Sequence, residues 1–147
     1  MGSMLEVFDN IKIQDLIAAQ SVGTGTVNAT GFLRTGYESG VFVIARGPVA
    51  GSPSAFSVAV TIQESDSLST GYTAVSVSTV EQTITYTASS SLSDLDTVSL
   101  DFRGLKKYLR VTAVATFTDG STPTMPLHVV AILGNAKTWP VGNVDAV

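Results

Sequence analysis

The sequence predicts a single all-β domain, a jelly-roll-like β-sandwich of about eight strands with an N-terminal arm. Segments in which apolar and polar residues alternate recur along the chain, and clusters of Gly, Pro, Ser and Asp separate them. A period of two residues is typical of a strand with one buried face. The 147 residues suffice for one domain with a sizeable core, and no repeat or shift in composition divides them.

The clearest alternation lies between residues 55 and 64, where Phe56, Val58, Val60 and Ile62 would share the buried face. Other segments repeat this pattern over shorter lengths. Further strands are predicted at residues 28–33, 40–46, 72–77, 81–87, 109–117 and 127–133, with a short one from residue 98.

The last two of these segments form a predicted hairpin whose turn contains Asp119-Gly120, a pair that tolerates positive φ. The returning segment, residues 127–133, is apolar on both faces except for His128. A strand buried on both sides is either central in a sandwich or covered by another subunit. Candidate interface residues on this strand are Leu127, Val129, Val130 and Ile132.

The predicted organisation has four parts. Residues 1–3 resemble the remnant of an expression tag, residues 4–27 form an arm and flexible connector, residues 28–141 form the sandwich, and residues 142–147 form a tail. Such an arm is either disordered or lies on a neighbouring molecule.

The arm has weak periodicity, which is compatible with an extended segment, a short strand or one helical turn at residues 14–19. Its apolar residues Leu5, Val7 and Phe8 are further candidates for an oligomer or capsid interface.

The composition excludes several classes of site. The chain has no Cys, so it has neither disulfides nor thiolate metal ligands. A net charge of −4 argues against a nucleic-acid-binding surface, and the basic cluster Arg103, Lys106, Lys107 and Arg110 is predicted to be a solvated strand edge. Only 14% of residues are charged, which suits a subunit that packs into a repeating assembly and also suits a secreted β-domain; no membrane-spanning segment is predicted.

No enzyme is predicted, and no catalytic, cofactor or metal site. His128 is the sole histidine and lies within an apolar strand, which favours a hydrogen-bonded core or interface role over catalysis. Two acidic pairs, Glu64 with Asp66 and Asp94 with Asp96, lie in predicted loops. Neither pair has the spacing of an EF-hand, so solvation of the loop is favoured over a cation site, which stays open as an alternative.

Several stretches resemble the head decoration (cement) proteins of tailed bacteriophages, small structural proteins encoded beside the major capsid protein. These stretches are Val41-Phe-Val-Ile, Phe56-Ser-Val-Ala-Val-Thr-Ile-Gln-Glu-Ser-Asp, Leu105-Lys-Lys-Tyr-Leu-Arg-Val, Val129-Val-Ala-Ile-Leu-Gly and Trp139-Pro-Val. The resemblance spans residues 30–141 and rests on strand and turn phrases.

The resemblance implies a virion protein that is assembled in the host cytoplasm and lies on the outer capsid surface. There a dimer or trimer would bridge neighbouring capsomers, with the major capsid protein and further copies of itself as partners. One alternative is another virion component from the tail, head completion, fibre or baseplate. A carbohydrate- or receptor-binding module is the other, and an exposed cluster of Tyr37, Tyr72, Tyr86 and Trp139 would favour it.

Overall fold

The computed structural model describes residues 11–75, 83–87 and 94–136, with residues 83–87 described for their backbone alone. The predictions for Leu5, Val7, Phe8, Trp139 and the tail therefore lie outside the described residues. The strands are β1 (Lys12–Val22), β2 (Gly25–Asn28), β3 (Phe32–Leu33), β4 (Tyr37–Arg46), β5 (Ala55–Ser65), β6 (Thr73–Ala74), β7 (Thr83–Thr87), β8 (Asp94–Asp101), β9 (Tyr108–Thr118) and β10 (Met125–Ala136).

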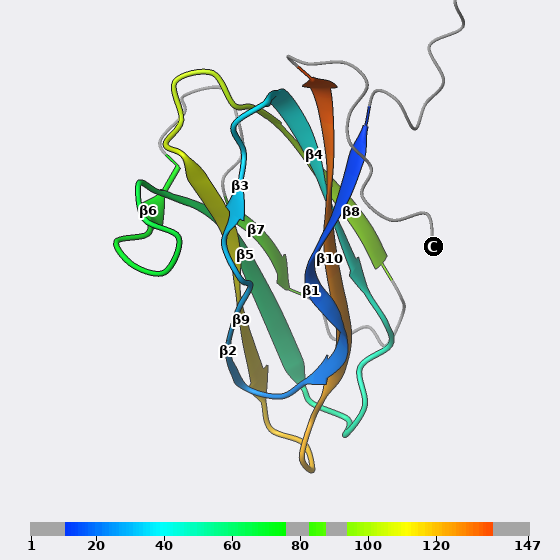
Figure 1. Cartoon of the computed structure of the whole chain (residues 1–147). Coiled ribbons are helices and arrows are strands. Elements are labelled where there is room, and N and C mark those ends of the chain that lie inside the picture. The colour runs from blue at the N-terminus through cyan, green and yellow to red at the C-terminus, as the bar shows by residue number, and fades with distance from the viewer. Residues whose placement is uncertain (1–10, 76–82, 88–93, 137–147) are drawn as a thin grey trace, which may run out of the picture.

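Two antiparallel sheets form the two layers of the molecule, as Figure 1 shows. The four-stranded sheet has the order β1-β10-β4-β8, and the six-stranded sheet has the order β2-β9-β5-β6, with β3 beside β9 and β7 beside β5. The described residues include no helix, and thus none long and apolar enough to cross a membrane.

The strand pairs are nested in the manner of a jelly roll. Strand β1 pairs with β10, β2 with β9, β4 with β8, and β5 with β7. A long antiparallel ribbon that is folded over and rolled into two sheets gives this set of pairs. The predicted fold class, an all-β sandwich with jelly-roll-like connections, is confirmed.

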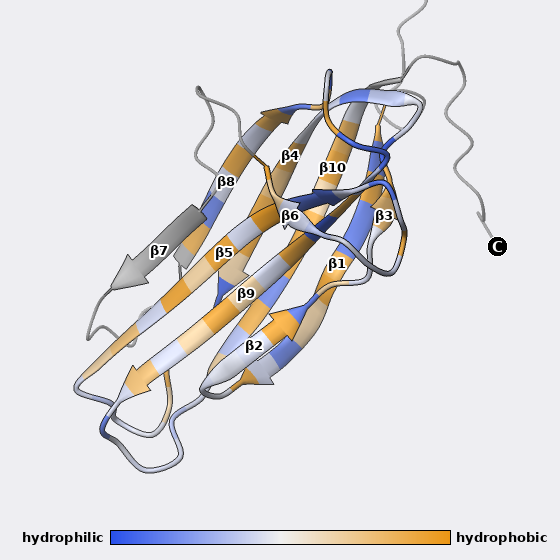
Figure 2. Ribbon diagram, turned by 90° about the vertical axis from the view of Figure 1, so that its left-hand side faces the viewer, coloured by the Kyte–Doolittle hydropathy of each residue, from blue (hydrophilic) through white to orange (hydrophobic). Residues whose placement is uncertain are grey.

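The core lies between the inner faces of the sheets. Along β5 buried and partly exposed residues alternate from Ala55 to Ile62, and the colours of β5 in Figure 2 alternate accordingly. Aromatic side chains join the two layers at one end, because Phe42 on β4 lies 6.5 Å from Phe32 on β3 and 6.4 Å from Phe102, centroid to centroid. Phe102 is fully buried.

The predicted boundary of the sandwich at residue 28 is wrong. Strand β1 belongs to the four-stranded sheet from Lys12, where it pairs with Leu133, and β2 belongs to the other sheet. The helical turn predicted as one option for residues 14–19 is also absent, because these residues are extended. Register shifts between Asp15 and Ile17 and between Ile17 and Gln20 interrupt the period of two, which concealed the strand.

Three further predicted strands have different bounds. The strand predicted at residues 28–33 is divided between the end of β2 and the two residues of β3, and the strand predicted at 72–77 is reduced to β6 in the described residues. Strand β8 begins at Asp94, ahead of the residue 98 that was predicted. Its exposed positions Thr97 and Ser99 are polar and short, so this sequence looks like a continuation of the preceding loop.

The predicted hairpin of residues 109–117 and 127–133 is wrong, because β9 belongs to the six-stranded sheet and β10 to the four-stranded sheet, so the two strands do not pair. The predicted turn between them is present, and Asp119 and Gly120 have φ values of 57° and 91° in it. A Cβ atom on Gly120 would lie 2.6 Å from the carbonyl oxygen of Gly51, so only glycine fits where these two loops meet. Strand β10 lies between β1 and β4, which is the central position that its apolar sequence predicted.

Candidate functional site

The outer face of the four-stranded sheet is the candidate functional site. Its pairing registers place apolar side chains side by side across the sheet. Ile13 on β1 is opposite Ile132 on β10, and Ile132 is opposite Val41 on β4. In the adjacent row Val130 is opposite Val43. Side chains at paired positions of neighbouring strands are in contact range, so these residues form one continuous surface.

We call this surface the apolar face. It consists of Ile13, Val41, Val43, Ala45, Leu95, Val130 and Ile132. Ile13 and Leu95, on the two edge strands, are 65% and 63% exposed, and the residues between them are partly exposed. Because apolar side chains on the outside of a monomer contribute nothing to its core, a contiguous group of them indicates an interaction surface.

Charged side chains border the apolar face in pairs of opposite sign. On one side His128 Nε2 lies 3.2 Å from Asp15 Oδ1. At the other end Arg103 donates hydrogen bonds to Asp101, with 2.5 Å between Nη2 and Oδ2. These bonds from Arg103 lower the pKa of the Asp101 carboxyl to about 2. The charged side chains of these two pairs therefore lie at the border of the apolar face, and its centre is uncharged.

A shallow cavity of about 620 Å³ lies at the Asp101 end of the apolar face. Val41, Ile132 and Gly134 contribute to its lining, and Glu38, Asp101 and Arg103 contribute its charged groups. Gly134 and Ser39 are paired residues of β10 and β4, and their small side chains leave this end of the sheet hollow.

The structure separates the interface residues predicted on β10. Leu127 and Val129 are buried in the core, with 2% and 0% of their surface exposed, so their side chains pack between the two sheets and are not available to an interface. Val130 and Ile132 lie on the apolar face and remain candidates. Their neighbours Val41 and Val43 were missed, although the run Val41-Phe-Val-Ile is apolar on both faces and carried the signal.

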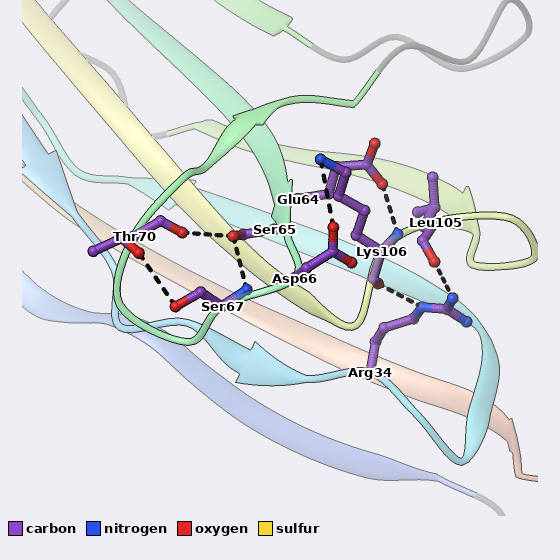
Figure 3. A network of polar contacts seen from close by, with 8 residues as sticks. All are labelled: Arg34, Glu64, Ser65, Asp66, Ser67, Thr70, Leu105 and Lys106. Atoms are coloured by element: carbon purple, nitrogen blue, oxygen red, sulfur yellow. Dashed lines mark hydrogen bonds and ion pairs between the residues drawn. The ribbon is translucent and has the colours of Figure 1, made fainter.

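The acidic pair Glu64 and Asp66 lies in a polar network at the end of the six-stranded sheet, shown in Figure 3. Glu64 Oε2 accepts a 2.8 Å hydrogen bond from the backbone N–H of Lys106, and the Lys106 ammonium lies 3.8 Å from Asp66 Oδ2. Both carboxylates thus face one lysine. In the part of the chain that the structure describes, no three acidic or histidine side chains come together as a metal site would require.

The same network holds the surrounding loops in place (Figure 3). Arg34 donates hydrogen bonds to the carbonyl oxygens of Leu105 and Lys106. Buried Ser65 donates to the Thr70 carbonyl at 2.5 Å and accepts from the Ser67 N–H at 3.0 Å. Because the contacts of Arg34 join two loops and those of Ser65 close the loop that follows β5, we assign this network a structural role. In the second acidic pair, Asp96 accepts from the Thr97 N–H, and nothing is described of the Asp94 side chain.

Two predictions about basic residues are changed by the structure. Of the two hydrogen-bonded roles predicted for His128, the core role is wrong, because 41% of its side chain is exposed on the outer face of the sheet, and the interface role stays a prediction. The basic cluster does not form a strand edge, because Arg110 lies on β9, between β2 and β5. Arg110 stacks on the ring of Tyr72, 4.2 Å from its centroid, and its Nε donates to Gln63 Oε1 at 2.7 Å.

The aromatic residues named for a carbohydrate-binding module are not gathered where they are described. Tyr37 begins β4 in the four-stranded sheet and packs against the core, whereas Tyr72 lies beside β9 under Arg110. Burial raises the pKa of both phenols. The side chains of Tyr86 and Trp139 lie outside the described residues.

Comparisons with known proteins identify no family. The sequence matches no protein-family model and no curated protein. Among solved structures, the chain is similar to a CBM36-1 domain of a multidomain xylanase from the hindgut metagenome of Trinervitermes trinervoides, with 11% identity, a TM-score of 0.43, and coverage of 88% of this chain and 100% of that one. It is also similar to Desmodium yellow mottle tymovirus, with 11% identity, a TM-score of 0.39, and coverage of 88% and 87%.

A third similar structure is PirA, with 8% identity, a TM-score of 0.38, and coverage of 90% of this chain and 100% of that one. At these identities and TM-scores the similarities carry no information about function. The functional proposal below therefore depends on the surfaces of this chain and on its sequence.

Proposed function

We propose that this chain is a structural subunit of a virion and that it decorates the outer surface of the capsid, where it bridges neighbouring capsomers. The observation that carries the proposal is the apolar face, a contiguous outward surface of Ile, Val, Leu and Ala on a sheet whose other side already supplies the core. The resemblance of its strand phrases to phage head decoration proteins supports the same role.

The function proposed is mechanical, not catalytic. A β-sandwich with a fully packed interior is stiff, and a surface with few long charged side chains loses little side-chain entropy when another protein covers it. A capsid offers the same site many times. Weak contacts made at several linked positions add up to tight attachment, so such a subunit needs no single strong site. Bridging of this kind would resist outward pressure on the shell.

The competing function is carbohydrate binding by one face of the sandwich. Sugar platforms are built from exposed aromatic rings, and Tyr37 and Tyr72 lie in different layers here. The outer face of the four-stranded sheet carries no aromatic side chain at the paired positions named above. These observations favour a protein partner over a sugar.

The test is to express the chain together with the major capsid protein encoded in the same genome and to purify the shells on a density gradient. The expected result is that the chain migrates with the shells in a fixed ratio and raises the temperature at which they break. The matched control is shells made without the chain, to which purified chain is then added in excess. Shells that carry no chain in either experiment would contradict the proposal. Binding of the chain to a glycan array would instead support the competing function, carbohydrate binding.

A further inference from the structure

We infer that the apolar face is the contact surface for a second copy of this chain, so that two subunits stack their four-stranded sheets face to face around a two-fold axis. This inference rests on the proposed function in one respect only, namely that the chain is an assembly subunit. Three properties of the face favour a second copy over other occupants: its shape, its size and its charge.

The shape of the apolar face suits another sheet. Its central rows contain β-branched Val and Ile side chains of similar length, flanked on β8 by Thr97 and Ser99. Such side chains interdigitate when two sheets pack about 10 Å apart, which is how the two layers of a β-sandwich form a core. The inner side of this same sheet already packs on another sheet in that way. A second copy offers an identical surface.

The size of the apolar face is sufficient for a dimer. Four strands spaced about 4.8 Å apart and about eight residues long cover roughly 500 Å². Strands β4 and β8 pair without interruption from Ser39 with Asp101 to Arg46 with Asp94, so the face is regular over that length. Two such faces together would bury about 1,000 Å², which is about the area that a biological interface should reach and below the roughly 1,200 Å² at which stable, specific interfaces begin. One copy alone would leave this surface in water.

The charge of the apolar face also fits a second copy. The chain has a net charge of −4, so two copies repel each other unless the contact surface is locally neutral. On this face the charged groups stay at the border, where His128 lies beside Asp15, Arg103 lies beside Asp101, and Glu38 is a further acid at the Asp101 end. A nucleic acid or a strongly basic protein would be better matched by a surface of one sign. The uncharged centre allows identical surfaces to meet.

The outer face of the six-stranded sheet provides the internal control. It carries Ser57, Thr61, Gln63 and Thr112, and its polar groups contact each other across the strands. The Thr112 hydroxyl, for example, lies 2.9 Å from Asn28 Oδ1 and 3.0 Å from Gln63 Oε1. Val114 is an exposed valine on β9 of this sheet, so the same substitution can be made on either face.

The experiment measures the mass of the full chain by light scattering over a range of concentrations. The wild-type chain is expected at twice its 15.3 kDa, Val114→Lys is expected to keep that mass, and Val43→Lys is expected to fall to a single chain with at least a tenfold higher dissociation constant. Circular dichroism checks that each variant is folded. Should Val43→Lys fail to fold, Leu95→Lys replaces it, because Leu95 is 63% exposed at the edge of the sheet.

A second measurement locates the contact. The chain has no Cys, so a single introduced thiol can be labelled selectively. Thr97→Cys on the four-stranded sheet is expected to react with a maleimide at least tenfold more slowly at high than at low protein concentration. Thr116→Cys, exposed on the six-stranded sheet, is expected to react at one rate throughout.

Three results would overturn the inference: a wild-type chain of 15.3 kDa at every concentration, a mass of three chains, or a dimer that Val114→Lys disrupts and Val43→Lys does not. The proposed function is tested separately. A monomer that still binds shells would leave the virion role standing and assign the apolar face to the capsid protein. A dimer that never binds shells would sustain the inference and remove the virion role.

Discussion

The inner faces of the two sheets are alike in being apolar and buried, whereas their outer faces differ in polarity. Inward residues of β5 and β9, such as Val58 and Val111, are as fully buried as Val129 of β10. Outward, however, β4 and β10 present Val43 and Val130, whereas β5 and β9 present Thr61 and Thr112 at comparable positions. Folding requires only the inner faces. The difference in polarity between the outer faces therefore indicates what each sheet contacts after folding.

The largest effect should come from the inner faces, where the sheets are alike. Leu127 of β10 and Leu109 of β9 are almost fully buried. Replacing either by Ala should lower the free energy of unfolding by about 2–5 kcal/mol, because methyl groups are removed from a packed core. Val114→Ala on the outside should cost less than about 1 kcal/mol. Urea denaturation measures all three, and a small loss for Leu127→Ala would show that the four-stranded sheet is not packed as described.

Two glycines of the four-stranded sheet sharpen the contrast between its faces. A Cβ atom on Gly40 would lie 2.5 Å from Cζ of the fully buried Phe102. Gly40→Ala should therefore destabilise the protein by about 1–3 kcal/mol through overpacking. On Gly134 the nearest atom to such a Cβ is Ser39 Oγ, 3.9 Å away, so Gly134→Ala should be neutral or stabilise by up to about 1 kcal/mol. Equal melting temperatures for the two variants would contradict this assignment.

A smaller effect is expected on the polar outer face. Arg110 stacks on Tyr72 and donates to Gln63, so Arg110→Ala should lower the free energy of unfolding by about 1 kcal/mol. The mass of the protein in solution should not change, because this face is not the proposed contact. Gln63→Ala is the matched control, since it removes the hydrogen bond and keeps the stack. A change of mass in the Arg110 variant would place an interface on the six-stranded sheet and would contradict the proposed contact.

The smallest effect concerns the border of the apolar face. Arg103 holds the pKa of Asp101 at about 2, below its ordinary 3.8, so the carboxylate favours the folded state above pH 4. This contribution is lost as the pH falls from about 4 to about 2. Arg103→Ala should return the pKa to its ordinary value, as measured by NMR titration of the carboxyl carbon. The wild-type spectrum is the reference, and an unmoved Asp101 would show that Arg103 is not its partner.

Local patterns predicted the strand with the clearest period of two and the turn with an Asp-Gly pair. The alternation in residues 55–62 located β5, and Asp119-Gly120 located the turn after β9, but the turn did not reveal that β9 and β10 lie in different sheets. For strand β1 the pattern left an extended segment, a short strand and a helical turn open, because its bulges place both Leu16 and Ile17 in the core and break the period. Its partner β10 lies at the far end of the sequence, and no local signal specifies such a pair.

The candidate site was half visible from the sequence. The segments of β4 and β10 are apolar on both faces, which indicated that Val130 and Ile132 contact another subunit. Which valines stand beside them depends on the registers between strands, and these are set by packing across the whole sheet. Ile13 and Leu95 complete the surface from segments that were assigned to an arm and a loop.

The pairing of β1 with β10 also determines when this protein can fold. Lys12 lies beside Leu133, so β1 cannot pair within the four-stranded sheet until the ribosome has made nearly all of the described chain. Chains whose contacts are mainly distant in sequence fold slowly, over about milliseconds to seconds, because the entropy of loop closure is lost before the distant contacts stabilise the fold. Until β10 arrives, the outward valines of β4 lie in an unfinished sheet.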